Sequence, residues 1–251
     1  MSDTLTQDAF LGGRMALWQP RNGYRAGVDP ILLAASVPAL PGQRVLDLGC
    51  GAGAAILALG RRVEGLDLTG VELQEQYVAL AARNAEDNAI PLRVVTADLS
   101  RLPAELRQEQ FDHVIANPPY YRDAAHTAAR DAGRATALGG ATALDLWVDA
   151  AARRLKPKGI FSLIQRVERL PELLTACTGR LGSIEVLPIA AREGRAPGLI
   201  LLRAKKGGRA DFRLHAPMIL HAGAAHTGDG DDYLPEIRAV LRDAAALRWP
   251  E

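Results

Sequence analysis

The sequence predicts an α/β fold in which helices cover both faces of a seven-stranded, mostly parallel sheet. From Arg44 onward, short apolar runs alternate with amphipathic helical stretches, which is the rhythm of a parallel sheet. With 48% hydrophobic residues among 251, the chain can bury the core of one such domain. The last two apolar runs are joined by a short loop, Ala190–Pro197, that has no room for a crossover helix. We therefore expect the sheet to end in an antiparallel hairpin.

Each expected strand is one of these short apolar runs. In chain order the seven runs are Arg44–Gly49, Gly70–Leu73, Leu92–Ala97, Phe111–Ala116, Gly159–Gln165, Ile184–Ile189 and Gly198–Ala204. Apolar residues at helical spacing predict helices at Ala54–Arg62, Gln74–Asn88, Thr142–Leu155 and Leu170–Leu181.

Two shorter segments flank this core, which spans residues 43–206. Residues 1–42 hold a short apolar helix pattern at Ile31–Val37, and we expect them to form a lid or substrate segment. Residues 207–251 pass through a Gly- and Asp-rich loop into a helix expected at Leu234–Leu247, and should pack on the core as an extension. Neither segment is large enough to be a separate domain.

Composition excludes several classes of protein. Lys and Arg number 30 and Asp and Glu 29, so the net charge of +1 excludes a generally polycationic nucleic-acid coat but not a local basic patch. Two cysteines, Cys50 and Cys177, are too few for a disulfide framework and predict reduced thiols. Neither a signal peptide at Met1–Phe10 nor an apolar run near the ~18 residues of a membrane span is present. We therefore expect a cytoplasmic protein.

A glycine-rich turn follows the first strand, in the segment Val45–Gly53. Gly49, Gly51 and Gly53 allow a sharp turn and let a ligand approach the backbone, with Cys50 as a small filler. A tight turn without a ligand is one interpretation. A second is the dinucleotide fingerprint of dehydrogenases, which Gly49, Gly51 and Ala54 formally satisfy, with Glu72 as the ribose acid.

Acids near the ends of three strands favour S-adenosylmethionine (SAM) over NAD as the ligand. Asp47 precedes the first glycine by two residues, where a dehydrogenase strand carries an apolar residue and a SAM site has an acid facing the cationic methionine end. Glu72 can accept both ribose hydroxyls, and Asp98, followed by Leu99, can accept the adenine amino proton. Asp98 could instead cap a helix, whereas Glu72 between apolar neighbours needs a partner, because burying an unpaired carboxylate is costly.

The fourth strand ends in the tetrapeptide Asn117-Pro118-Pro119-Tyr120. Two prolines stop the ladder and fix the backbone, and a strand terminator is the plain interpretation. The tetrapeptide also resembles the Asn/Asp-Pro-Pro-Tyr motif of amino-methyltransferases, and this resemblance implies methylation of a planar nitrogen. The Asn117 side-chain oxygen and the Pro118 carbonyl would each accept one N–H of the amine, which favours a more pyramidal nitrogen, and Tyr120 would offer a stacking face. No strong base is needed, because the N-methylated cation is very acidic.

The order of these motifs resembles the bacterial tRNA adenosine-N6 methyltransferase family, within the Rossmann-like class I SAM-dependent methyltransferases. Besides the glycine loop and the tetrapeptide, the resemblance rests on Leu11-Gly-Gly-Arg14, Gly27–Leu33, an Arg/Asp-rich loop at Arg122–Arg134 and Gly194–Leu202. It covers roughly residues 10–245. It implies an enzyme that methylates the N6 amine of adenosine in tRNA near the anticodon, at a position-37-type site. It also implies that the N-terminal segment closes over the methionine end of SAM through Gly27 and Asp29.

A local excess of basic residues gives RNA binding separate support. Between Ile189 and His215 the acids are Glu193 and Asp211, whereas seven residues are basic: Arg192, Arg195, Arg203, Lys205, Lys206, Arg209 and Arg213. With Arg14, Arg21 and Arg25 they could hold phosphates beside an extruded base. The residues that we expect to bind the substrate are Lys205, Lys206, Arg209, Arg14, Arg21, Pro119 and Tyr120. Solvated surface charge is the alternative.

Other functions stay open at this point. Glutamine-N5 methylation of a release factor uses the same tetrapeptide, but those enzymes usually carry a separate N-terminal helical domain. Guanine-N2 methylation of rRNA is another option, and a SAM-binding module without catalysis a third. The pair His221 and His226, with the acids after it, matches no standard zinc spacing, so we expect no metal. Trp18 and Tyr121 could flank the base or simply pack.

Overall fold

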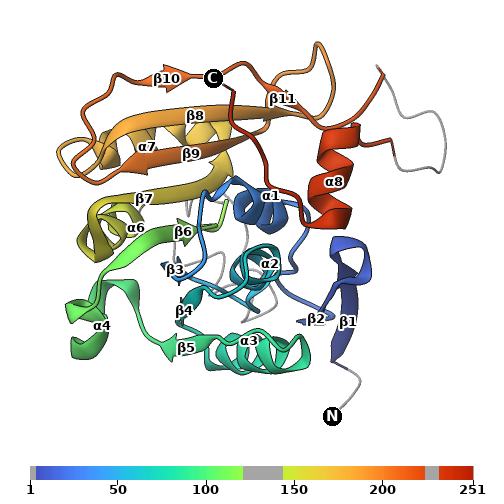
Figure 1. The fold of residues 1–251 in the computed structure, drawn as a ribbon, viewed down its shortest axis with the longest axis vertical. Coiled ribbons are helices and arrows are strands. Elements are labelled where there is room, and N and C mark those ends of the chain that lie inside the picture. The colour runs from blue at the N-terminus through green and yellow to red at the C-terminus, as the bar shows by residue number, and fades with distance from the viewer. Residues whose placement is uncertain (1–3, 121–143, 224–231, 251) are drawn as a thin grey trace, which may run out of the picture.

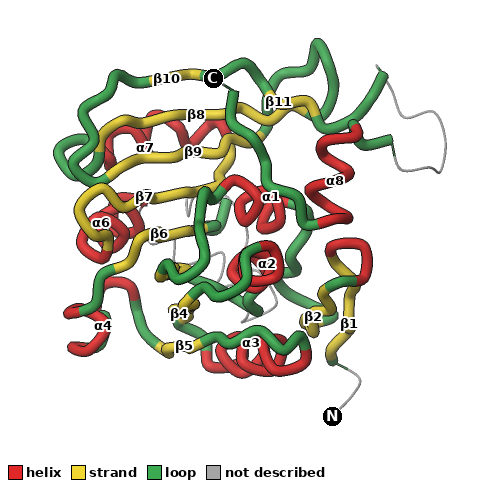
Figure 2. The backbone as a smooth tube through the Cα atoms, in the orientation of Figure 1, coloured by secondary structure: helices red, strands yellow, loops and turns green. Residues whose placement is uncertain are grey.

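The structure is a computed structural model that describes residues 4–120, 144–223 and 232–250 (Figures 1 and 2). The strands are β1 (Leu5–Phe10), β2 (Met15–Pro20), β3 (Arg44–Leu48), β4 (Asp67–Glu72), β5 (Arg93–Thr96), β6 (Phe111–Ala116), β7 (Leu155–Arg166), β8 (Gly182–Ala190), β9 (Leu199–Lys205), β10 (Arg213–Leu214) and β11 (Met218–Ile219). The α-helices are α1 (Asp29–Ser36), α2 (Ala54–Arg62), α3 (Glu75–Asp87), α4 (Ala104–Gln108), α6 (Leu144–Arg154), α7 (Leu170–Cys177) and α8 (Pro235–Asp243). The Arg122–Arg134 loop, Tyr121 and His226 lie outside the described residues.

The central sheet has the predicted seven strands, in the order β5-β4-β3-β6-β7-β9-β8. β9 runs antiparallel to both β7 and β8, and the remaining neighbours are parallel, so the expected reversed strand is present. Two short strands, β10 and β11, extend the sheet beyond the prediction by pairing parallel with β8. The arrowheads of β6 and β9 point in opposite directions (Figure 1).

The sheet separates two apolar layers. Side chains that alternate along one strand enter different layers: Val45 packs with α1 and α2, whereas Leu46 packs with α6 and α7. Such alternation is expected of a strand that is covered on both faces, because successive side chains of a pleated strand point to opposite faces of the sheet. Among the helices that the structure describes, none is long and apolar enough to cross a membrane.

The two flanking segments both contribute to the core. Within residues 1–42, α1 is almost fully buried against α2, so only the rest of that segment could act as a lid. The C-terminal helix α8 is shorter than predicted, because the backbone reverses at Ala244, which has φ +55°. The tail then crosses α1, where the Leu247 amide donates to the Ala35 carbonyl at 2.9 Å.

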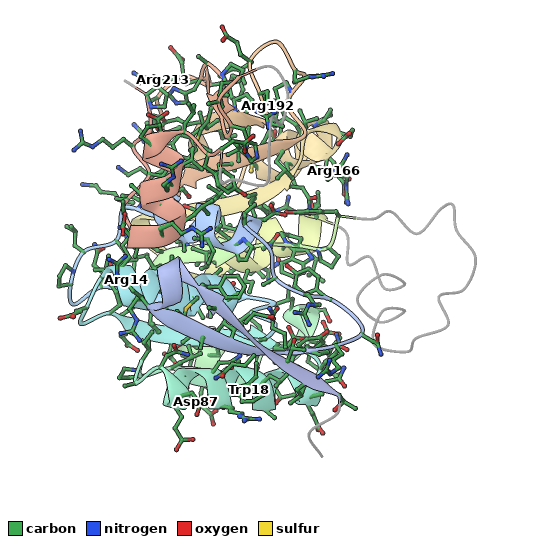
Figure 3. The ribbon with its side chains drawn as sticks, turned by 90° about the vertical axis from the view of Figure 1, so that its right-hand side faces the viewer. Arg14, Trp18, Asp87, Arg166, Arg192 and Arg213 are labelled. Carbon is green, nitrogen blue, oxygen red and sulfur yellow. The ribbon has the colours of Figure 1, made fainter. Side chains whose placement is uncertain are left out.

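An N-terminal hairpin, which the sequence analysis did not predict, is formed by β1 and β2. Two carboxamides, one in α3 and one on the residue that follows it, bind the outer edge of β2 as another strand would. Asn84 exchanges hydrogen bonds with the backbone of Trp18 (2.7 and 3.1 Å), and Asn88 does so with Ala16 (3.0 and 2.7 Å). Trp18 packs on α3, where its indole N–H donates to Asp87 (Figure 3), so packing accounts for this residue and a place beside the base stays a prediction.

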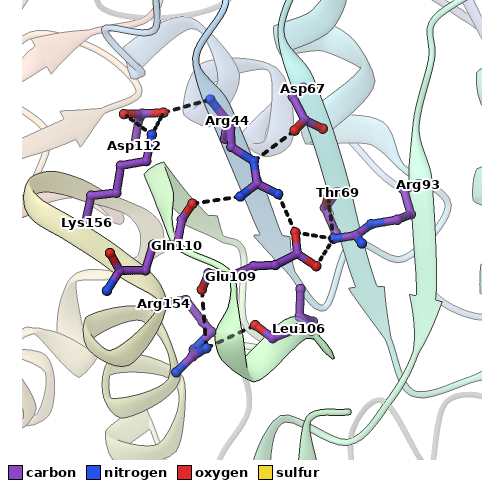
Figure 4. Close-up of polar contacts among 10 residues, drawn as sticks. All are labelled: Arg44, Asp67, Thr69, Arg93, Leu106, Glu109, Gln110, Asp112, Arg154 and Lys156. Carbon is purple, nitrogen blue, oxygen red and sulfur yellow. Dashed lines mark hydrogen bonds and ion pairs between the residues drawn. The ribbon is translucent and has the colours of Figure 1, made fainter. Parts of the chain in front are cut away.

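The amino edge of the sheet, where the parallel strands begin, is closed by ion pairs (Figure 4). Arg44 binds Asp67 at 2.8 Å and also pairs with Glu109, which Arg93 contacts at 2.8 Å. Nearby, Asp112 accepts from the Arg44 amide and from the Lys156 ammonium. Burial alone would raise the pKa of both Glu109 and Asp112, but these donors hold each pKa below its usual range.

Candidate active site

Each glycine in the turn after β3 serves a different structural purpose. A Cβ on Gly49 would lie 2.4 Å from the Trp147 ring of α6, so this glycine allows helix and strand to pack. A Cβ on Gly51 would meet nothing within 4 Å, although the residue has φ +55°. Gly51 therefore exposes its backbone to open space, as a ligand-binding turn requires. Gly53, at φ +89°, leads into α2.

Two acids meet beneath this turn at the carboxyl edge of the sheet. Asp47 is 2% exposed and Glu72 8% exposed. Glu72 accepts from the Gly51 amide at 3.0 Å and from the Gln74 amide at 2.9 Å, one bond to each oxygen. Burial and the Glu72 charge raise the pKa of Asp47 well above its usual value, and a backbone hydrogen bond at Ile56 opposes this shift. A buried carboxylate beside another one favours a cationic ligand.

Asp98 lies at the same edge, after β5, but it is exposed. Its Oδ1 accepts from the amide and the hydroxyl of Ser100, both at 2.8 Å, and these bonds lower its pKa. It therefore caps the short helix that contains Leu99, as the alternative interpretation had it. The cap occupies one carboxylate oxygen, so a ligand role for the other oxygen stays a prediction.

The tetrapeptide extends from the end of β6, next to β3. Pro118 is buried, and its carbonyl accepts from Nε2 of Gln165 at 3.3 Å. Gln165 is fully buried on β7, and its other amide atom, Oε1, accepts from the Arg166 amide at 2.9 Å. The Pro118 carbonyl, which is predicted to accept from the amine, thus also accepts a hydrogen bond from Gln165, a residue that the sequence did not indicate.

The N-terminal segment reaches the tetrapeptide through two tyrosine hydroxyls. Nδ2 of Asn117 donates to Oη of Tyr24 at 3.2 Å, and Oη of Tyr120 donates to Asp29 at 2.6 Å. Burial, followed by the charge of Asp29, raises the pKa of Tyr24 to about 12 and also raises that of Tyr120. Both hydroxyls therefore remain protonated at neutral pH.

A pocket connects these features. Its lining includes Asp47, Gly49, Gly51, Tyr24, Tyr77 and Asn117. One space beneath the N-terminal segment thus contacts Asp47, the glycine turn and the tetrapeptide, although these three are separated along the chain. Gly27 lies in the loop above it and is exposed.

Residues 27–185 match the family described as the methyltransferase small domain. The chain belongs to this family. A tRNA1(Val) (adenine(37)-N6)-methyltransferase of Tolumonas auensis is 31% identical over 192 residues, which cover 73% of this chain and 77% of that protein.

Two solved structures share the fold. A predicted O-methyltransferase from Agrobacterium tumefaciens superposes with a TM-score of 0.72 at 30% identity, over 87% of this chain and 98% of that one. A 16S rRNA N2 G1207 methyltransferase of T. thermophilus, in complex with AdoMet and guanosine, gives a TM-score of 0.58 at 25% identity, over 80% and 50% of the chains. These findings confirm the predicted class I methyltransferase fold and family resemblance.

The methyltransferase is SAM-dependent, as the sequence predicted, and its residues fit the cofactor. The open space at Gly51 admits a ligand against the backbone, and the buried Asp47 in the pocket lining suits a cationic end. Each oxygen of Glu72 accepts one backbone amide and keeps a second lone pair for a hydroxyl of a diol. SAM supplies an electrophilic methyl group when bound. The predicted part of this chain is to orient the acceptor: Asn117 and the Pro118 carbonyl would offer hydrogen-bond acceptors, and Tyr120 would offer an aromatic face.

Not every predicted substrate residue lies near this pocket. Lys205 ends β9 opposite Gly182 and Ile160, where β8 and β7 begin their pairing with β9, and Lys206 and Arg209 follow it. Because β9 is antiparallel, these three residues lie at the amino edge, across the sheet from Asn117. The structure therefore does not bring them to the tetrapeptide, and Lys206 binds the Leu155 carbonyl at 2.9 Å.

Arg14 also has a structural partner. It binds the Arg242 carbonyl and Asp243 at the end of α8, at 2.5 and 2.9 Å. Gly12, in the same turn, would place a Cβ 2.7 Å from that carbonyl, so the Leu-Gly-Gly-Arg motif docks the hairpin on α8. Arg21, by contrast, is exposed near the pocket's N-terminal cover.

The sequence did not indicate that Tyr24, Gln165 and Asn84 belong to the site or support it. Each acts through a contact with a residue distant in the chain, so local spacing gave no signal for Gln165 or Asn84. Tyr24 lies in a Gly-rich, Arg-rich stretch, where an aromatic residue between Gly23 and Arg25 was a weak signal of a functional loop. No group of three or more potential metal ligands occurs in the part of the chain that the structure describes.

Proposed function

We propose that this methyltransferase transfers a methyl group to the exocyclic N6 amine of adenosine in tRNA, near the anticodon at a position-37-type site. The observation that carries the proposal is that Asn117 lines the same pocket as Asp47 and Gly51. An amide acceptor beside the cofactor turn suits a planar amine, whose lone pair is too delocalised to react without such help. Asp47, Gly49, Gly51, Gly53, Glu72, Asp98, Leu99, Asn117, Gly27 and Asp29 are the proposed cofactor residues.

The tRNA acceptor is supported by the Tolumonas auensis relative, whose name specifies adenine 37 of a valine tRNA. The Agrobacterium protein is described as a predicted O-methyltransferase. In this chain, however, the Asn-Pro-Pro-Tyr segment presents acceptors for N–H donors, as methylation of an amine requires. Exposed Arg21 and Arg195 lie on the N-terminal segment and on the loop that joins β8 and β9 at the carboxyl edge. We assign phosphate contacts to these arginines in place of Lys205, Lys206 and Arg209.

The test supplies purified protein with radiolabelled SAM and one of three acceptors: unmodified total tRNA, rRNA or a recombinant release factor. Nucleosides from the RNA are then separated and identified. Label in N6-methyladenosine from tRNA is the expected result, and transcripts with single adenosines replaced would locate the site. Label on the release factor, or in N2-methylguanosine from rRNA, would overturn the proposal in favour of the corresponding acceptor. Label in none of them, with SAM still bound, would indicate a binding module.

A further inference from the structure

Asn117 has a side chain whose two ends do opposite things. Its Oδ1 accepts hydrogen bonds, whereas its Nδ2 only donates them. An acceptor amine brings N–H groups to the site, so a carboxamide turned end for end would present N–H to N–H and repel it. Amine methylation therefore requires something that holds Asn117 in one of its two orientations.

Tyr24 makes a contact that favours one of these orientations. A phenol hydroxyl can donate or accept, but the charges of Asp29 and Asp47 near it attract the hydroxyl proton of Tyr24 and leave the oxygen as the acceptor. This oxygen accepts from Nδ2 of Asn117 at 3.2 Å, which leaves Oδ1 for the acceptor amine. We propose that Tyr24 is a positioning residue, whose hydroxyl fixes the Asn117 carboxamide so that its oxygen meets the acceptor amine. The inference rests on the proposed N-methylation.

Packing does not account for Tyr24. The residue is 47% exposed, so an aromatic side chain gains little there from burial. Its hydroxyl end nevertheless points to Asn117 and feels the charges of Asp29 and Asp47. A half-exposed ring with its polar end in the pocket is what a positioning role requires.

The backbone of Tyr24 is itself held by the rest of the fold. The hydroxyl of Tyr77 on α3 donates to the Tyr24 carbonyl at 3.4 Å. Two residues on, the Ala26 amide donates to Oε1 of Gln19 at 2.7 Å, and Gln19 is 2% exposed on β2. β2 is in turn bound by Asn84 of α3, which also contacts the Ala52 carbonyl in the glycine turn at 2.9 Å. Hairpin, cofactor turn and Tyr24 are thus tied to one helix.

The first experiment compares Tyr24→Phe with the parent enzyme in kcat, in KM for the RNA and in Kd for SAM. Loss of one hydroxyl should lower kcat about 10-fold, because a small misorientation of a reacting group is costly, and should leave the Kd for SAM within about 3-fold. Tyr233→Phe is the matched control, since it removes the hydroxyl of a tyrosine whose ring stacks on His221 outside the site. A kcat reduced less than about 3-fold would overturn the proposal.

The second experiment repeats Tyr24→Phe in an Asn117→Asp background. A carboxylate has two equivalent oxygens, so it presents an acceptor in either orientation and needs no such positioning. The kcat penalty of Tyr24→Phe should therefore shrink to less than about 3-fold. An equal penalty in both backgrounds would show that Tyr24 acts through something other than Asn117.

Two safeguards keep the tests decisive. If Asn117→Asp is too slow to measure, the kcat of the single Tyr24→Phe variant decides alone. The identity of the methylated product from the parent enzyme tests the proposed function separately, because a different acceptor would change that product whether or not Tyr24→Phe lowers kcat.

Discussion

The two edges of the central sheet use the same residue types in opposite ways. At the amino edge, Asp112 and Glu109 are each held by arginine or lysine donors. At the carboxyl edge, Asp47 is far more buried, and the described residues give its carboxylate no cationic side-chain partner. Charges satisfied within the chain stabilise it, whereas a buried acid without a cation is a cost that a ligand can offset. The comparison thus separates structural acids from binding acids without reference to any relative.

The largest effect that would sharpen this comparison is expected at Asn117. Asn117→Ala removes an acceptor for the amine and should lower methyl transfer about 10³-fold. The affinity for SAM, measured by calorimetry, should stay within about 3-fold, since Asn117 borders the cofactor but acts mainly on the other substrate. A collapse of SAM binding would show that Asn117 is mainly a cofactor ligand.

Two neighbouring glycines should respond differently to a methyl group. Gly49→Ala drives a Cβ into Trp147 and should lower the free energy of unfolding by about 3 kcal/mol. Gly51→Ala has free space around it, so it should cost only about 1 kcal/mol for its positive φ, while weakening SAM binding. Urea unfolding and SAM titration of both variants measure this; equal stability losses would contradict the assignment.

Paired acids from the two edges give the most direct test. Asp47→Asn should weaken SAM binding on the order of 100-fold, yet raise the stability of the SAM-free protein by about 1 kcal/mol, because it removes an acid whose ionised form is disfavoured by burial and by the Glu72 charge. Asp112→Asn should lower stability by about 1 kcal/mol and leave the SAM affinity unchanged. Opposite signs of the two stability changes are the signature; a destabilised Asp47→Asn protein would remove the physical basis of the comparison.

The last prediction concerns His113, which is buried on β6, and its effect appears only as the pH is lowered. Burial lowers its pKa from 6.5 to about 4, and its Nε2 donates to the Gln43 oxygen at 2.9 Å. Because the unfolded chain binds the proton more readily, His113 stabilises the fold above pH 6.5, and this contribution is lost as the pH falls toward 4. The loss should be about 2 kcal/mol between pH 7 and pH 5.

Denaturant unfolding across that pH range, in the parent and in His113→Gln, isolates the histidine from the other titrating groups. The variant should show a shallower fall in stability by the stated amount. Parallel curves for the two proteins would show that His113 is protonated as easily in the fold as in the unfolded chain.

The fold was largely predictable because the sheet's strands are buried on both faces. Such strands are short apolar runs, and β6 and α2 were predicted with the bounds that the structure shows. The N-terminal hairpin was missed because β1 and β2 mix polar and apolar residues and are held by side chains of α3. The two glycines between them were the available signal of a turn.

The site was predictable only where the residues that form it are close together in the sequence. The glycine turn, Asp47 and the tetrapeptide are local patterns, whereas the contacts of Tyr24 and Gln165 depend on how distant elements meet. Lys205 was placed with the substrate because it lies in a locally basic stretch of the sequence. The antiparallel direction predicted for the strand that it follows already implied that the end of this strand lies at the opposite edge.

The carboxamides of Asn84 and Asn88 have a consequence for how this protein behaves at high concentration. A two-stranded ribbon leaves an outer row of amides and carbonyls that can template the strand of another molecule. Here the side chains of one helix face occupy that row on β2, residue by residue, at positions that alternate along the strand. The outer edge of β2 is thereby shielded from intermolecular pairing without the addition of a third strand, and replacing both asparagines with alanine would expose this edge as a new seed for aggregation.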